Sequence, residues 1–459
     1  MKRVMLIQPP SNIMLSRKEG KPALPPYGLV CLAGSLRQAG HEVQIYDMLT
    51  EGYEKESLYP NGRFIRYGDN RDDLARRIES FNPDVVGVSG MASLRHFEAC
   101  DVVKWTKGCN PAITTVMGGI HPSCFPDMVL KDCEGALNHI VKGEGELAIL
   151  DIVNSQNENQ PRCNQIHSHP LTKTDAEPAP AHDLLPLDKY VEIWNKHEYY
   201  FFPLNGRTIS STTSRGCVNR CEHCPHDVIF GRGWRKRKIS DIVREAEFAV
   251  GLGVTDIQYH EYNGLAEYNF VESVAKALKP FDIRWGYPEG VWLQPLDKTL
   301  LETMYNAGMD YINLAIESPH EGVLSTMPGK DVNISHAERV VKWCRDIGFY
   351  TNAFFMIGFP DQTIADMNKT VDYAISLDID TAVFFIAQPL PGSPSWNKVE
   401  FIDGFHPMML RYGKCNIKSK NWTAEQVEAV RHEGREKFLR SRAGKGRVRG
   451  GTCMVREAL

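Results

Sequence analysis

The sequence contains no apolar run approaching the roughly 18 to 20 residues that a membrane-spanning helix requires. It also lacks an excess of positive charge, since 53 Lys and Arg stand against 57 Asp and Glu, for a net charge of −4. A chain with this balance has no general affinity for nucleic acid. We therefore expect a globular protein with neither a membrane span nor a nucleic-acid partner.

Cysteine is sparse for a protein held together by disulfides. The 12 cysteines are spread over 459 residues, far below the density of a secreted disulfide scaffold. The initial Met-Lys-Arg precedes only four apolar residues, too few for a secretory signal peptide. Both features favour a reducing compartment, and we expect a cytoplasmic location.

Residues 1–153 alternate short apolar strands with helical segments. This alternation is typical of a parallel sheet covered on both faces, and it predicts an α/β, doubly wound (flavodoxin-like) domain. The ligand of such a domain lies at the carboxyl ends of the strands. No GxGxxG follows the first strand, so nothing here favours a dinucleotide. Strands are expected at residues 4–7, 43–47, 84–89, 113–117 and 139–141.

Candidate ligand-binding residues follow three of these strands. Gln8 and Pro9 follow the first, Ser89 and Met91 the third, and the pair Gly118-Gly119 the fourth. Glycines at such positions let the backbone approach a bulky ligand closely. Taken alone, each of these motifs is as well explained by a tight turn as by a ligand-binding site.

Residues 154–206 are rich in Asn, Gln, His and Pro, which predicts a linker. Residues 207–395 then alternate strand and helix signals again, with Ser240 expected to cap the first helix. Six βα units predict a partial (β/α)6 barrel with its chemistry at the carboxyl-terminal mouth. Residues 396–459 predict a small C-terminal appendage, with a helix at 423–439 and a basic tail.

Cys217, Cys221 and Cys224 form a CxxxCxxC motif at the first strand-to-helix turn of this barrel. A cubane iron–sulfur cluster bound at every iron needs four thiolates. Three thiolates leave one iron open, and an open coordination position is where a metal does chemistry. The alternative is a structural zinc site with His223 or His226 as the fourth ligand.

Further short motifs follow in order along the chain, and with CxxxCxxC they make it resemble a known family. Over nearly its whole length the chain resembles the cobalamin-binding radical S-adenosylmethionine (SAM) enzymes. The motifs are residues 25–29 (Pro-Pro-Tyr-Gly-Leu), 89–91 (Ser-Gly-Met), 118–119 (Gly-Gly), 143–146 (Gly-Glu-Gly-Glu), 316–318 (Ile-Glu-Ser), 356–360 (Met-Ile-Gly-Phe-Pro) and 389–394 (Pro-Leu-Pro-Gly-Ser-Pro).

The resemblance implies that the three cysteines hold a [4Fe-4S] cluster whose open iron binds SAM. An electron from a donor such as flavodoxin or ferredoxin would then cleave SAM to a 5′-deoxyadenosyl radical. Glu317 would bind SAM, together with Glu261 and Asn263. The alternative for Glu317 is a buried carboxylate paired with a cation inside the barrel.

The resemblance also implies that residues 1–153 bind cobalamin through Gln8, Pro9, Ser89, Met91, Gly118 and Gly119. Family members with a histidine below the cobalt carry Asp-x-His-x-x-Gly after the first strand, where this chain has Gln8-Pro9-Pro10-Ser11. Cobalamin is therefore expected to have no protein histidine as its lower ligand. The histidines of this domain, His41, His96, His121 and His139, are expected to be surface or core residues.

The function implied is C-methylation of an unactivated carbon of a small-molecule substrate, using methylcobalamin and the 5′-deoxyadenosyl radical. An oxidative cyclase or rearrangement enzyme would use the same cofactors. A methylthiotransferase would need a second cluster, and a non-catalytic cobalamin or cluster sensor belongs to a different class of protein. The cysteines available for a second cluster are Cys31, Cys100, Cys109, Cys124 and Cys133.

Overall fold

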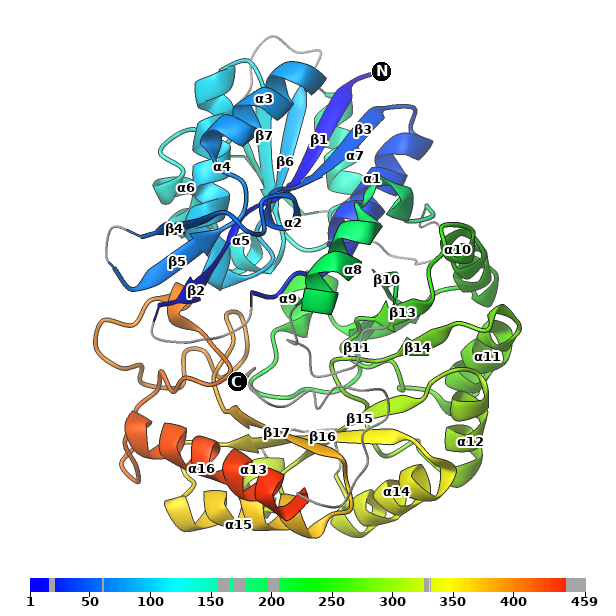
Figure 1. The fold of residues 1–459 in the computed structure, drawn as a ribbon. Coiled ribbons are helices and arrows are strands. Elements are labelled where there is room, and N and C mark those ends of the chain that lie inside the picture. The colour runs from blue at the N-terminus through cyan, green and yellow to red at the C-terminus, as the bar shows by residue number, and fades with distance from the viewer. Residues whose placement is uncertain are drawn as a thin grey trace. The chain divides into compact units, whose positions relative to one another are not determined.

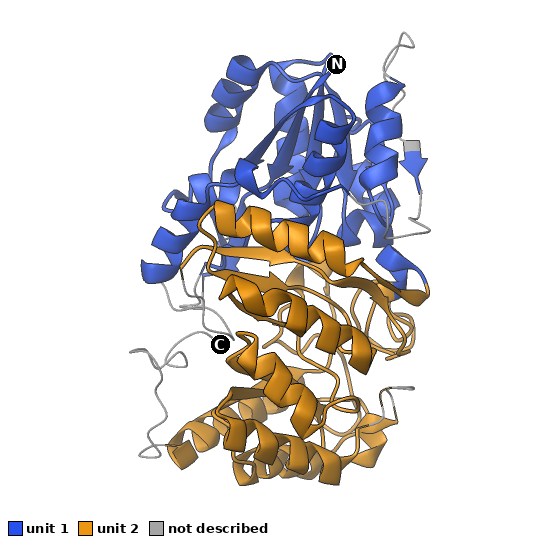
Figure 2. Cartoon of the chain, turned by 90° about the vertical axis from the view of Figure 1, so that its right-hand side faces the viewer, with its two compact units in different colours: residues 1–199, 227–231 blue, residues 200–226, 232–459 orange. Residues whose placement is uncertain are grey.

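The computed structural model describes residues 1–15, 21–59, 62–155, 165–168, 178–196, 206–325, 330 and 332–442. The chain divides into two compact units, residues 1–199 with 227–231 and residues 200–226 with 232–459 (Figure 2). The predicted basic tail beyond residue 442 lies outside the described residues, as does much of the predicted linker. Among the described residues no helix has the length and apolar character needed to cross a membrane.

The first unit is built on a six-stranded sheet in the order β3-β1-β6-β7-β8-β9 (Figure 1). Every neighbouring pair in it is parallel, so the predicted doubly wound parallel sheet is confirmed. The last strand, β9, comes from the stretch predicted as a linker and pairs with β8. The strands are β1 (Arg3–Gln8), β3 (Glu42–Asp47), β6 (Val85–Ser89), β7 (Thr114–Gly118), β8 (His139–Val141) and β9 (Gln165–His167).

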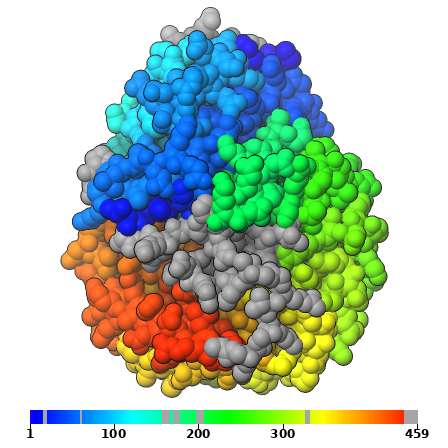
Figure 3. Space-filling view, in the orientation of Figure 1, coloured from blue at the N-terminus to red at the C-terminus, as the bar shows by residue number. Residues whose placement is uncertain are grey.

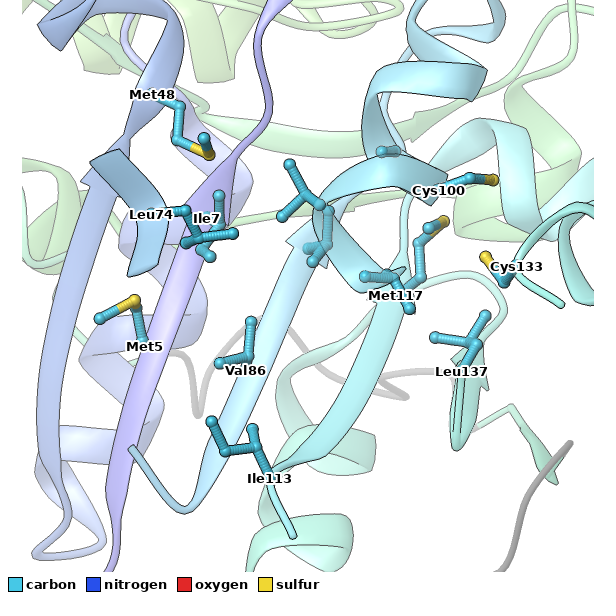
Figure 4. Close-up of a cluster of buried hydrophobic side chains, with 14 of the residues drawn as sticks. Met5, Ile7, Met48, Leu74, Val86, Cys100, Ile113, Met117, Cys133 and Leu137 are labelled. Atoms are coloured by element: carbon cyan, nitrogen blue, oxygen red, sulfur yellow. The ribbon is translucent and has the colours of Figure 1, made fainter. Parts of the chain in front are cut away.

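Helices cover both faces of this sheet. Met5 and Ile7 of β1 enter an apolar cluster with residues of α3, α4 and α6 (Figure 4). Val4 and Leu6 are buried on the opposite face, where α1 packs against β1 and α7. The helices are α1 (Tyr27–Gln38), α2 (Met48–Glu51), α3 (Arg71–Phe81), α4 (His96–Cys109), α5 (Ile120–Cys124), α6 (Pro126–Asp132), α7 (Glu146–Asn154) and α8 (Leu187–Lys196).

A second, smaller sheet in this unit was not predicted. Its strands, β2 (Ser11–Met14), β5 (Phe64–Tyr67) and β4 (Glu56–Leu58), pair antiparallel in that order. They are short and β4 is exposed along its whole length, so no apolar run marks them in the sequence. The pairing of β2 with β5 is also distant along the chain, which local pattern does not reveal.

The second unit contains two three-stranded parallel sheets, and an isolated bridge links Val291, on the segment that follows the first sheet, to Leu314 in the second. Val291 donates its N–H to the carbonyl oxygen of Asn313 at 2.8 Å, and Ala315 donates to that of Val291 at 3.1 Å. The segment after the first sheet thus lies against the edge strand of the second, and the six strands follow one another along the chain with helices between them. The strands are β10 (Thr208–Ser211), β13 (Asp256–Tyr259), β14 (Arg284–Gly286), β15 (Tyr311–Glu317), β16 (Tyr350–Ile357) and β17 (Thr381–Ile386).

Helices alternate with the strands of the second unit, as predicted. The cap predicted at Ser240 is wrong, because the first helix already begins at Ile239, after Lys238, and has no side-chain cap. The helices are α10 (Ile239–Gly251), α11 (Tyr268–Leu278), α12 (Lys298–Asn306), α13 (Glu321–Leu324), α14 (Ile334–Ile347), α15 (Ile364–Ser376) and α16 (Ala424–Arg442), with α9 (His226–Phe230) before them.

The last helix, α16, belongs to the same compact unit as the barrel. It packs against α15 and β17, and in Figure 3 its red atoms lie beside the yellow-to-orange atoms of α15. Arg431 of this helix donates from Nε to the carbonyl oxygen of Phe384 at 2.8 Å. The described part of residues 396–459 therefore closes one side of the barrel.

The barrel packing is tested at Gly308. This residue has φ +101°, and a Cβ on it would lie 2.2 Å from the carbonyl oxygen of Ile283. Gly308→Ala should therefore lower the free energy of unfolding by about 2 kcal/mol or more in urea denaturation. The control is Gly251→Ala, where an added Cβ meets nothing within 4 Å. Equal effects of the two substitutions would contradict the packing.

Candidate active site

The cysteine loop begins in a short hairpin. Strand β11 (Ser214–Cys217) follows β10 and pairs antiparallel with β12 (Gly233–Lys236). Cys217 therefore ends a strand, and Cys221 and Cys224 lie on the loop that follows. The Cys224 N–H donates to the carbonyl oxygen of Cys221 at 3.2 Å. The sequence did not predict this hairpin, which gives the first cysteine a fixed backbone.

A buried carboxylate holds the chain that enters this loop. Glu261 accepts hydrogen bonds from the N–H of Thr213 and from the hydroxyl of Ser214, one on each of its oxygens. Trp234 of β12 donates from Nε1 to the same Ser214 hydroxyl at 2.8 Å. Burial raises the pKa of Glu261, although these hydrogen bonds oppose the shift. Glu261, predicted to bind SAM, thus orients the start of the cysteine loop.

The far side of the loop is tied to the motif at residues 389–394. Leu390 donates its N–H to the carbonyl oxygen of His223 at 3.4 Å, and Ser395 donates to that of Glu222 at 2.9 Å. Cys221 packs against Val323, Met356 and Ala387, which lie just beyond or at the ends of β15, β16 and β17. Because these are the carboxyl ends of the strands, the loop lies at the barrel mouth, where the chemistry of such barrels is located.

The three thiols of the loop are not drawn together around one position in the described structure. In the described part of the chain, no three His, Cys, Asp or Glu residues are grouped so that they could hold a single metal ion. A structural zinc site needs such a group, whereas a cubane cluster binds each thiolate through a different iron. Burial raises the pKa of Cys221 to about 11 and that of Cys224 to about 12. Cluster binding must therefore release protons from these thiols.

Glu317 ends β15 with φ +69°, in the left-handed region. Such a conformation costs on the order of 1–3 kcal/mol for a residue other than glycine, and strain of this kind is concentrated at functional sites. The carboxylate pairs with the buried ammonium of Lys330. Burial alone would lower the pKa of Lys330, but the charge and hydrogen bond of Glu317 together with the nearby Cys221 and Cys224 outweigh it, and the pKa is raised. Glu317 is therefore buried and paired with a cation, and its contact with SAM stays a prediction.

Lys330 is a site residue that the sequence did not single out. Its charge lowers the pKa of both Cys221 and Cys224, against the larger effect of burial. An isolated lysine outside any periodic segment is most often a surface residue, so no pattern distinguishes it. The distant contact with Glu317 is what brings it into the site.

Asn263 and His223 are among the buried polar side chains with atoms that no described residue satisfies. Both Oδ1 and Nδ2 of Asn263 lack a hydrogen-bond partner in the described part of the chain, and so does Nδ1 of His223. Burying a polar group unpaired costs about 1–3 kcal/mol. These atoms fit a polar cofactor at the barrel mouth, which agrees with the role predicted for Asn263.

The candidate cobalamin residues gather at one edge of the first unit's sheet. Ser89 ends β6 and Gly118 ends the adjacent β7. The Gly90 N–H donates to the carbonyl oxygen of Gly118 at 2.7 Å. Gly119 has φ +115°, and a Cβ there would lie 2.9 Å from the carbonyl carbon of Gly90. The two glycine loops therefore need their small residues to approach each other.

Three further predicted residues lie at the same edge. Gln8 ends β1, which is the other neighbour of β6, and Pro9 follows it; both are buried. Gln8 donates from Nε2 to the carbonyl oxygen of Leu24 at 3.5 Å. Met91 is 50% exposed, so it offers an apolar side chain to a ligand. Backbone from three adjacent strands thus meets at the edge where ligands of doubly wound sheets bind.

The cysteines of the first unit do not gather into a second cluster site. Cys31 lies on α1, on one face of the sheet, while Cys100 on α4 and Cys133 belong to the core on the other face. Cys109 is exposed at the end of α4. The second cluster that a methylthiotransferase needs has no ligand set among these described residues.

Comparison with known proteins agrees with both sites. Residues 19–153 match the family model of the B12 binding domain, and residues 211–374 match that of the radical SAM superfamily. The fold and the open-iron cysteine loop thus define an enzyme with two cofactor-binding domains. The chain belongs to the radical SAM enzymes that carry an N-terminal B12-binding domain, and its cofactors are cobalamin, a [4Fe-4S] cluster and SAM.

Two curated proteins and one solved structure show the range of its relatives. The chain is 26% identical to cytidylyl-2-hydroxyethylphosphonate methyltransferase of Streptomyces wedmorensis, over 93% of this chain and 88% of that protein. It is 26% identical to anaerobic magnesium-protoporphyrin IX monomethyl ester cyclase of Rubrivivax gelatinosus, over 81% and 69%. The cobalamin-dependent radical enzyme OxsB, solved with aqua-cobalamin and SAM, has a TM-score of 0.68 at 13% identity, over 97% of this chain and 67% of that one. This last likeness shows the fold.

The cluster is tested by removing one ligand. Cys224→Ala should reduce the iron content of anaerobically prepared protein from about four per chain to near zero, because two thiolates do not hold a cubane cluster. The control is Cys109→Ala, which removes an exposed cysteine at the end of α4 and should leave iron unchanged. Full iron in the Cys224 variant would show that the loop is not the ligand set.

Proposed function

We propose that the protein is a C-methyltransferase acting on an unactivated carbon of a small-molecule substrate. The observation that carries the proposal is the combination, in one chain, of an open-iron cysteine loop and a B12-binding sheet edge. The similarity to a phosphonate methyltransferase over 93% of this chain supports methylation. When bound, the cluster and SAM supply a 5′-deoxyadenosyl radical and cobalamin supplies the methyl group.

The barrel residues are proposed to bind and orient SAM. The unpaired amide of Asn263 offers both a donor and an acceptor to a polar ligand. Lys330 and Glu317 together present a cation and an anion near the cysteine loop. These charges complement the carboxylate and amino groups by which SAM binds the open iron. Glu261 is proposed to act indirectly rather than by contact with SAM. It accepts hydrogen bonds from Thr213 and Ser214 and thereby positions the cysteine loop.

The sheet-edge residues are proposed to bind cobalamin. Gln8 and Pro9, Ser89 and Met91, and the pair Gly118-Gly119 come from the ends of three neighbouring strands. A Cβ on Gly119 would meet the backbone of Gly90, so glycine is what lets these two loops come together at the proposed cobalamin edge. We propose that no histidine of the chain serves as the lower ligand of the cobalt, since none follows the first strand.

An electron donor of the flavodoxin or ferredoxin type is proposed as the redox partner. Strand β12 and its flanks present Arg232, Lys236 and Lys238 beside the strand that carries Cys217. A basic surface next to a redox centre favours association with an acidic protein. A cytoplasmic location, where such donors are available, is proposed on the same ground.

An oxidative cyclase or rearrangement enzyme is the second candidate. The observation that favours it is the similarity to a porphyrin ester cyclase over 81% of this chain. The two functions share both cofactors and differ in whether a methyl group leaves SAM for another molecule. That difference is measurable before the substrate is known.

The methyl group is followed with methyl-labelled SAM. The reduced holoprotein should carry label from SAM into the bound corrinoid, detected by mass spectrometry after the corrinoid is extracted in the dark. It should also release 5′-deoxyadenosine, which reports the cluster. Release of 5′-deoxyadenosine with no label in the corrinoid would remove methyl transfer and favour the cyclase.

The proposed cobalamin site at the sheet edge is tested by substituting Gly119, whose surroundings leave no space for a side chain. Gly119→Ala should weaken corrinoid binding at least tenfold in equilibrium titration, because its Cβ forces the two glycine loops apart. Gly135→Ala is the matched control, since Gly135 also has positive φ (+80°) but open space around it. Any backbone strain is then comparable in the two variants, and only the crowding at the sheet edge differs. Equal affinities would place cobalamin elsewhere.

A further inference from the structure

Four polar side chains form a continuous hydrogen-bonded chain through the first unit. Ser93 Oγ lies 2.9 Å from Nδ1 of His121, and His121 Nε2 lies 2.8 Å from Nδ1 of His96. His96 Nε2 lies 2.8 Å from Oδ2 of Asp132. Both histidines are 1% exposed. The sequence predicted these two histidines as ordinary surface or core residues, and the structure shows them linked.

The carboxylate at one end fixes the direction of every bond. An ionised carboxylate only accepts hydrogen bonds, so His96 donates from Nε2 to Asp132. Nδ1 of a neutral His96 is then an acceptor, and His121 donates to it from Nε2. Nδ1 of His121 is an acceptor in turn, and it receives the hydroxyl proton of Ser93. Each ring nitrogen has one defined role, which is the condition for passing a proton along such a chain.

The two ends of the chain lie in different surroundings. Ser93 is half-buried in η1 (Ser93–Arg95), the turn that follows β6 and Met91. Asp132 ends α6 with its side chain 29% exposed. His121 lies on α5, two residues beyond Gly119. The chain therefore runs from the edge of the sheet that carries the candidate cobalamin residues, through the protein, to solvent.

Two cysteine thiols lie near the histidine pair. Cys100 of α4 has its Sγ 3.8 Å from Nδ1 of His96, and Cys133 follows α6 beside Cys100; the rings of Phe97 and Phe125 fill other sides. Burial lowers the pKa of His96, but Cys100 and Asp132 outweigh it and the net shift is upward. His96 is thus held where it readily accepts a proton, beside an otherwise apolar core.

We propose that Ser93, His121, His96 and Asp132 are a proton relay between the cobalamin-binding edge of the sheet and solvent at Asp132. The proposal rests on the proposed function only for the identity of the ligand at that edge. For each proton that Ser93 Oγ receives, Ser93 gives its own to His121 Nδ1, His121 gives one from Nε2 to His96 Nδ1, and His96 gives one from Nε2 to Asp132. One proton crosses, and nothing is oxidised or reduced. Ser93 offers the bound cofactor a hydroxyl, and the other three are positioning residues.

A relay suits this edge because the corrinoid has no expected histidine ligand from the chain. The reactivity of a bound metal cofactor is set by its axial ligation and by the hydrogen bonds around it. The Ser93 hydroxyl is hydrogen-bonded through two histidines to a carboxylate. It can therefore take up or give a proton when the charge of the cofactor changes. An apolar side chain in place of either histidine would fill the core without that capacity.

The relay is tested first in the full chain without cofactors, by nitrogen NMR of its histidine side chains. Both His96 and His121 should show the tautomer with hydrogen on Nε2. In Asp132→Ala that preference should be lost at both rings, because the fixed acceptor is gone. Asp127→Ala, on the same helix α6, should leave both tautomers unchanged. Hydrogen on Nδ1 of His121 in the native protein would overturn the relay.

The second readout is the absorption spectrum of the bound corrinoid across the range in which histidine titrates. Asp132→Ala should move the pH midpoint of the spectral change by about one unit, a tenfold change in proton affinity, while Asp127→Ala should not. Identical profiles for the two variants would overturn the relay. Failure of the native chain to bind corrinoid would instead overturn the proposed cofactor site. The tautomer measurement needs no cofactor and would still test the hydrogen-bonded chain.

Discussion

The carboxylate of Glu261 is the contact on which the cysteine loop depends. It joins the end of one barrel strand to the residues between another strand and the first cysteine, because it accepts from both Thr213 and Ser214. A backbone held in place reduces the ordering that three thiols need before they can share one cluster. Without this carboxylate the loop would be tied to the barrel mainly through the bonds of Leu390 and Ser395 on its far side.

A small number of contacts also determines the geometry at the sheet edge of the first unit. There the constraint is space rather than charge, since a Cβ on Gly119 would meet the backbone of Gly90 and a Cβ on Gly90 would meet Pro122. A parallel sheet buries its strands on both faces and leaves the carboxyl edge as the place for a ligand. Each unit thus presents its functional residues on short loops that the strands behind them hold in position.

Buried polar side chains determine the charge and the hydrogen bonding of both sites. Lys330 and Glu317 neutralise each other at the barrel mouth, and Asp132 orders two histidines in the core of the first unit. Buried charges of this kind are costly unless they are paired. Their positions beside the cysteine loop and beside the glycine loops suggest a functional reason for that cost, which packing alone does not provide.

The sequence by itself determined the alternation of strands and helices, the cysteine loop and the glycines at the strand ends. These features are local, because a run of apolar residues or a CxxxCxxC spacing is complete within a few positions. The antiparallel sheet of β2, β5 and β4 has no such local signal. Only the tertiary structure decided which distant polar groups meet: Lys330 with Glu317, Glu261 with Ser214, and His96 with His121. Those contacts join residues 13 to 47 positions apart, and pairing over such separations follows from how the elements pack rather than from any pattern along the chain.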